Sequence, residues 1–130
     1  MDIVRRAALG AAIAFVLNAI VRTAVKTIGN VPDAFDPFTW PPIFWASVIG
    51  VAGGAVVYAL LVRFLGARAD TVFRWVAYSL MVLSFITPVT LLWSTPPQYP
   101  GTTVLTVAAL EVMHVTTAVA TVVALTRGRA

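Results

Sequence analysis

Five polar side chains in otherwise apolar stretches are the residues of this sequence best suited to chemistry. Asn18 and Arg22 lie four residues apart, Glu111 and His114 lie three apart, and Ser84 stands in a third apolar stretch. Spacings of three and four place both side chains of a pair on one face of a helix. A glutamate and a histidine there suit acid–base chemistry or proton relay, and an arginine suits an anionic group. We interpret all five as candidates for ligand binding.

The residue inventory argues against a catalytic or metal centre. The chain has no cysteine, one histidine and one glutamate. The sequence Glu111-Val112-Met113-His114 has the E-x-x-H form of di-iron bundles, but that site needs a second copy and two more glutamates. Haem on His114, with Met81 or Met113 or across a dimer, is a weak alternative. No phosphate-binding glycine loop, serine–histidine–aspartate set or zinc pattern is present. We therefore predict no catalytic residue, no metal and no cofactor, and we favour a non-enzymatic role.

The elements that carry these side chains are predicted to be membrane-spanning helices. Of the 130 residues, 60% are hydrophobic and 11% are charged, against about 45–50% and 25% in soluble domains. Four apolar runs, roughly 3–27, 42–65, 73–93 and 102–125, are each long enough to cross a hydrocarbon core of about 30 Å as a helix. The predicted fold is all-α, a single domain over 1–130 that forms an antiparallel transmembrane four-helix bundle.

Glycines and prolines predict where these helices end. Gly29, Asn30 and Pro32 should stop the first helix, with the glycine available for a left-handed cap. Three prolines, Pro37, Pro41 and Pro42, should keep the following stretch irregular until the second helix begins. Pro88 lacks an amide hydrogen for the carbonyl of Ser84 and should kink the third helix.

Basic residues predict the orientation in the membrane. Seven fall on one side of a four-span zigzag: Arg5, Arg6, Arg63, Arg68, Arg74, Arg127 and Arg129. The other two, Arg22 and Lys26, lie toward the opposite side. We predict a multi-pass protein of the cell (inner) membrane with both termini cytoplasmic. The net charge of +4 does not indicate nucleic acid, because no basic face carries interleaved aromatic residues.

Depth along the helices predicts an ion pair. At about 1.5 Å per residue, Asn18 lies roughly 14 Å below the outer end of the first helix, and Glu111 lies equally deep in the fourth. First and fourth helices are neighbours in an up-down-up-down bundle. We therefore predict that Arg22 pairs with Glu111, with Asn18 and His114 flanking the pair.

Small residues in the second run predict close helix packing. Ala46, Gly50 and Gly54 recur at four-residue spacing, which lets two helix backbones approach each other. Two alternatives stay open: packing within one chain, or contact with a second copy or a partner membrane subunit. The stretch 30–41, rich in aromatic residues and proline, either covers the bundle as an apolar flap or is a stiff connector.

The chain also resembles a family of small bacterial four-span membrane proteins catalogued only as a domain of unknown function. The resemblance rests on Asn18, on the serine and proline of Ser84-Phe85-Ile86-Thr87-Pro88, and on the Met113-His114 pair, and it covers nearly the whole chain. A weaker similarity is to small four-span proteins of the DoxX-like kind. The resemblance implies the fold and topology and implies no chemistry.

Three functions are compatible with these features. The leading hypothesis is a structural or accessory membrane component, which contacts the lipid bilayer and has a buried Arg-Glu-His-Asn cluster. The second is a pocket for an amphipathic or lipid-like molecule between the first, third and fourth helices. The third is a small proton-coupled transporter.

Overall fold

The computed structural model describes residues 2–94 and 99–128, and within them the chain is helical with no strand. The elements in chain order are α1 (Ile3–Gly29), η1 (Asp36–Phe38), α2 (Trp40–Leu65), η2 (Gly66–Arg68), α3 (Ala69–Ser84), α4 (Ile86–Thr90), η3 (Leu91–Trp93) and α5 (Val104–Thr126). Arg129, one of the basic residues used for the predicted orientation, lies outside the described residues.

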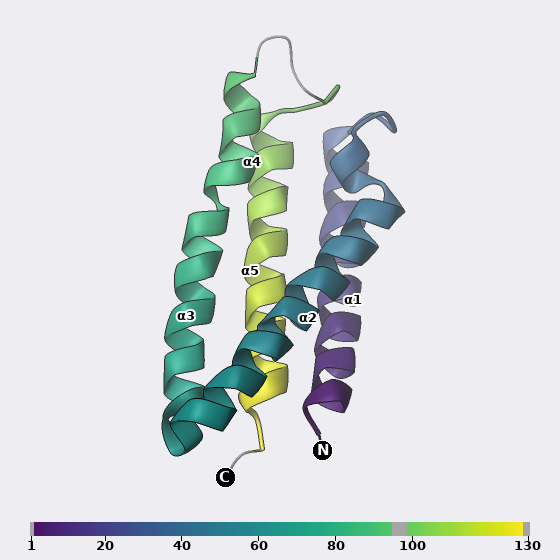
Figure 1. The fold of residues 1–130 in the computed structure, drawn as a ribbon. Helices are drawn as coiled ribbons and strands as arrows, with labels where there is room; N and C mark the ends of the chain where they lie inside the picture. The colour runs from purple at the N-terminus through teal and green to yellow at the C-terminus, as the bar shows by residue number, and fades with distance from the viewer. Residues whose placement is uncertain (1, 95–98, 129–130) are drawn as a thin grey trace.

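Three segments are long and apolar enough to cross a membrane, judged by length and composition. They are Ile3–Gly29, Trp40–Trp93 and Val104–Thr126. The middle segment turns back on itself at η2, so that α2 forms one arm and α3, α4 and η3 together form the other (Figure 1). Both termini therefore lie at one end of the molecule, which we call the terminus end. The opposite end, which holds residues 30–39, is the loop end.

The end of α1 agrees with the predicted stop, but a different residue takes the left-handed conformation. Asn30 has φ 48° and ψ 44°, while Gly29 remains the last helical residue. Asparagine tolerates this region better than other residues with a side chain. At its start, α1 is capped by Asp2, whose carboxylate accepts a hydrogen bond from the Arg5 amide.

The start of α2 corrects the expectation that prolines delay the second helix. Pro41 and Pro42 lie in the first turn of α2, which begins at Trp40. Amide hydrogens have no helical acceptor in a first turn, so proline is tolerated there and its fixed φ suits the helix. The prediction of irregular chain through these positions was therefore wrong.

The third run is interrupted where Pro88 predicts a kink. Helix α3 ends at Ser84, and α4 begins at Ile86. Between them, the amide of Phe85 bonds to Val82 in a tighter turn. Because Pro88 has no amide hydrogen, the Ser84 carbonyl loses its usual helical partner. The last long helix, α5, begins with a capping box between Thr103 and Thr106.

Helix α1 packs mainly against α5 and also against α2, and α2 and α5 both contact α3. Figure 1 shows α2 crossing the other helices at a slant, close to α3 at the terminus end and close to α1 at the loop end. Arg6, although charged, is buried between the ends of the chain. Its Nη1 donates to the carbonyl of Leu125 at 3.0 Å, and its Nη2 donates to that of Gly128 at 3.3 Å.

The loop end is closed by the aromatic side chains of Phe35 and Phe38, which we call the aromatic plug. Each is 1% exposed, their ring centres lie 4.9 Å apart, and they pack with Val31, Ile43 and Met113. The stretch after α1 thus covers this end of the helices with buried aromatic rings, as in the flap alternative.

Candidate functional site

A cavity of about 780 Å³ lies between α2, α3 and α5. We call it the lateral groove. Among the described residues that line it, none is an arginine, lysine, aspartate or glutamate, and most are apolar. The polar side chains that line it are Asn18, Ser84, His114, Thr117 and Thr121.

The groove exists because α2 leans away from α3. The two helices meet near the turn at η2 and diverge toward the loop end, while α5 lies behind them (Figure 1). Residues from Pro42 to Val57 of α2 line one side, a length of about 22 Å at 1.5 Å per residue. Ala46, Ile49 and Leu80 on its rim are exposed. The groove therefore opens sideways, between two apolar helices.

The small residues of α2 belong to this groove, and two of them also contact α5. A Cβ atom at Gly54 would lie 2.6 Å from Thr121 Cγ2, and one at Gly50 would lie 3.2 Å from Thr117 Cγ2. A Cβ at Gly53 would meet nothing within 4 Å. Gly50 and Gly54 thus let α2 approach α5 within the chain, whereas Gly53 leaves open space. Ala46 lines the groove further along α2.

Asn18 joins three helices at the back of the groove and is 4% exposed. Its Nδ2 donates to Ser47 Oγ and to Thr117 Oγ1, both at 3.0 Å. Its Oδ1 accepts a hydrogen bond from the Thr116 hydroxyl. Both amide hydrogens are therefore used within the protein, as buried polar groups require.

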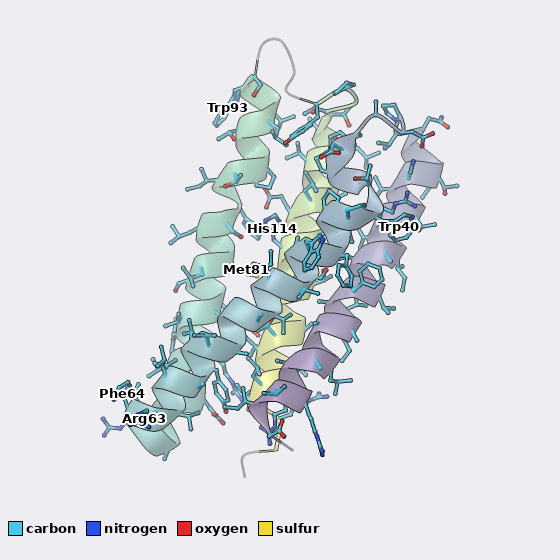
Figure 2. All side chains as sticks on the ribbon, turned by 45° about the vertical axis from the view of Figure 1, so that its right-hand side comes forward. Trp40, Arg63, Phe64, Met81, Trp93 and His114 are labelled. Atoms are coloured by element: carbon cyan, nitrogen blue, oxygen red, sulfur yellow. The ribbon has the colours of Figure 1, made fainter. Side chains whose placement is uncertain are left out.

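His114 lines the groove from α5, and Ser84 lines it from the end of α3. The Nδ1 of His114 lies 2.7 Å from the carbonyl of Leu110. Since a carbonyl only accepts, we assign the tautomer with the proton on Nδ1, in which Nε2 is an acceptor. The Ser84 hydroxyl donates to the Met81 carbonyl at 2.6 Å. His114 and Met81 lie about halfway along the molecule (Figure 2).

Arg22 does not form the predicted ion pair. Its Nε donates to the carbonyl of Phe38 at 2.8 Å, and its guanidinium carbon lies 4.1 Å from the centre of the Trp40 ring. The arginine is thus held by the aromatic plug and the start of α2. It does not line the lateral groove.

Glu111, the predicted partner of Arg22, makes no ion pair with it, so the prediction of an Arg22–Glu111 pair was wrong. Its two carboxyl oxygens are buried and have no hydrogen-bond partner among the described residues. Asn18 contacts Thr116 and Thr117, which lie about 140° and 240° around α5 from Glu111 at 3.6 residues per turn. Glu111 therefore faces away from α1, and the predicted Arg-Glu-His-Asn cluster does not form as one unit.

The error in depth arises at the helix ends. Helix α1 ends at Gly29 and α5 begins at Val104, each two residues later than predicted. These shifts add. The first moves Asn18 two residues further from the end of α1, and the second moves the α5 residue at any given depth two positions further along the chain. Asn18 consequently lies level with Thr116 and Thr117 instead of Glu111.

Of the eight predicted residues, six line one groove and two do not. Asn18, Ser84 and His114 share it with the three small residues Ala46, Gly50 and Gly54, which the sequence had indicated as candidates for helix packing or oligomer contact. Sequence reasoning had not singled out Thr117, although that residue follows His114 by three positions on the same helical face.

A charged pair lies at the loop end, outside the groove. The Lys26 ammonium binds the Asp33 carboxylate. The hydrogen bond and the charge of Lys26 lower the pKa of Asp33 below its ordinary value. Within the described residues, no three potential metal-ligating side chains lie together.

These features define an all-helical protein with apolar helices of membrane-spanning length. The chain belongs to a family of unknown function: the model of the Family of unknown function (DUF6069) matches residues 1–130. The resemblance to an uncharacterised family is thereby confirmed. No curated protein and no solved structure matches the chain.

Proposed function

We propose that this chain is an integral membrane protein whose lateral groove binds an amphipathic molecule that enters from the bilayer. The observation that carries the proposal is the groove itself, an apolar cavity that opens sideways between α2 and α3 and has polar groups at its centre. Its volume of about 780 Å³ lies within the roughly 300–1,000 Å³ of small-molecule sites.

The exposed surface supports a position within the bilayer. Large apolar side chains lie exposed along the long helices, for example Val16, Ile49, Val56 and Leu80. Apolar surface of this extent is unusual on a protein in water. Lipid would solvate it, and the helices satisfy their own backbone groups, as the hydrocarbon region requires.

We infer four spans. The arm α2 has 26 residues, and the arm from Ala69 to Trp93 has 25, which correspond to about 37–39 Å at 1.5 Å per residue. Together with α1 and α5, these two arms give four helical segments, and each is longer than the hydrocarbon thickness of about 30 Å. Arg63 lies at the terminus end, opposite Trp93 (Figure 2). By the positive-inside rule, arginines near the terminus end support our proposal that both termini lie on the cytoplasmic side of the cell membrane.

A small ligand fits the groove better than a helix does. A helix of about 10 Å diameter needs roughly 1,600 Å³ over 20 Å of length, about twice the cavity. This comparison favours the binding of a lipid-like molecule over a partner helix seated within the groove. An accessory or oligomeric role stays a prediction that the groove neither supports nor opposes.

Photo-crosslinking tests this function. The protein in phosphatidylcholine nanodiscs is exposed to diazirine-bearing sixteen-carbon amphiphiles, and the labelled peptides are identified by mass spectrometry. We expect labels on groove residues of α2 and α3. Gly53→Phe should reduce them several-fold, because Gly53 lines the groove and its added side chain starts from a Cβ that meets no described atom within 4 Å. Val56→Phe is the matched control, since Val56 is 62% exposed and does not line the groove. Uniform labelling of all apolar surfaces, unchanged by Gly53→Phe, would refute the proposal.

A further inference from the structure

The hydrogen-bonding groups of the lateral groove specify the head of its occupant. We propose that the groove recognises a neutral hydroxyl group, as in a long-chain or polycyclic alcohol, in preference to a carboxylate or an ether. This inference rests on the proposed function and names the ligand class of the same site.

Most hydrogen-bond donors among the polar side chains of the groove already have an acceptor within the protein. Asn18 uses both amide hydrogens on Ser47 and Thr117. Ser84 donates to the Met81 carbonyl, and Thr121 donates to the Thr117 carbonyl at 2.7 Å. The Nδ1 hydrogen of His114 is directed at Leu110. A ligand therefore meets these residues mainly through their lone pairs.

The remaining capacity matches a hydroxyl. Nε2 of His114 and Oγ of Ser84 are left as acceptors, and each has no hydrogen bond from another described residue. Thr117, one turn from His114, accepts from Asn18 and has no acceptor for its own hydroxyl hydrogen among the described residues. An alcohol can donate to Nε2 or Oγ and accept from Thr117. An ether lacks the hydrogen that the acceptors require.

Depth and charge disfavour an ionised head. His114 lies ten residues from Val104 and twelve from Thr126 on α5, about 15–18 Å from either end. None of the described residues that line the groove is a lysine or an arginine, so a carboxylate would have no fixed countercharge among them. A charge at this depth is costly, whereas a hydroxyl needs only hydrogen bonds.

The test compares three diazirine probes with the same sixteen-carbon chain: the alcohol, its methyl ether and the carboxylic acid. In phosphatidylcholine nanodiscs at neutral pH, we expect the alcohol to label groove peptides about three- to tenfold more than the ether, the effect of one hydrogen bond in a membrane protein. Ser84→Ala and His114→Ala should each lower this ratio, and Val56→Ala should leave it unchanged.

Each outcome separates this inference from the proposed function. Equal groove labelling by alcohol and ether, or preferential labelling by the acid, would overturn the hydroxyl preference while the groove remained a binding site. A preference for the alcohol that survives both Ser84→Ala and His114→Ala would also overturn it. Absence of groove labelling by all three probes would refute the proposed function itself.

Discussion

Alanine at Gly54 should destabilise the protein, whereas alanine at the neighbouring Gly53 should not. The added Cβ at Gly54 would lie 2.6 Å from Thr121 Cγ2, about 1 Å inside an ordinary carbon–carbon contact. Thr121 has little freedom to move away, because it is 5% exposed and its hydroxyl donates to the Thr117 carbonyl. Overpacking of this kind costs about 1–3 kcal/mol.

The matched variant removes the effect of helix propensity from the comparison. Both substitutions replace glycine by alanine within α2, so the gain of up to about 1 kcal/mol in propensity is shared. At Gly53 the new Cβ meets nothing within 4 Å. We therefore expect Gly54→Ala to be less stable than Gly53→Ala by about 1–3 kcal/mol.

Unfolding in mixed micelles by sodium dodecyl sulfate, followed by tryptophan fluorescence, measures this difference. A second substitution locates the clash: Thr121→Ser removes Cγ2 and keeps the hydroxyl, so it should restore most of the stability lost in Gly54→Ala. Such a double-mutant cycle isolates the pairwise contact. Equal midpoints for the two alanine variants, or no rescue by Thr121→Ser, would refute the proposed approach of α2 to α5.

Three further predictions concern the polar residues. Arg22→Met and Glu111→Gln should have additive effects on unfolding free energy, within about 0.5 kcal/mol, because the two side chains are not paired; a larger coupling in a double-mutant cycle would contradict this. Asn18→Ala should destabilise the protein by about 1–2 kcal/mol, since it removes three side-chain hydrogen bonds between helices; an unchanged midpoint would contradict it, and Asn18→Gln tests whether the amide alone suffices. The lowered pKa of Asp33 means that its pairing with Lys26 stabilises the folded state above the unfolded pKa of Asp33 and is lost as pH falls through the lower folded pKa. Unfolding midpoints measured between pH 6 and about pH 3 should thus fall less steeply in Asp33→Asn than in the unmodified protein.

Sequence reasoning predicted the helices better than their mutual orientation. The length of an apolar run fixes where a helix can exist, and the α1 stop near Gly29 and the break before Pro88 have local causes in asparagine and proline geometry. The position of a residue around the helix axis is not specified in this local way. It depends on which faces pack together, and depth along the helix does not specify it.

Glu111 illustrates that limit. Depth alone placed it level with Asn18, but Thr116 and Thr117 make the contacts. The sequence predicted a pocket between the first, third and fourth helices, but the groove lies between α2, α3 and α5, with Asn18 as the contribution of α1. The wall formed by α2 could not be predicted, because Gly53 is indistinguishable in the sequence from Gly50 and Gly54. The slant of α2 in the folded chain determines which glycines contact α5 and which one borders the open groove.

The contacts of Arg6 have a consequence for biogenesis. This residue is made near the start of synthesis, yet its carbonyl partners at Leu125 and Gly128 are made 119 and 122 residues later. At about 5–20 residues per second, the interval is roughly 6–24 s. Through that time Arg6 lacks these two carbonyl acceptors, and α1 lacks its main packing partner, α5. The two ends of the chain can therefore be joined through Arg6 only after the closing helix has been made.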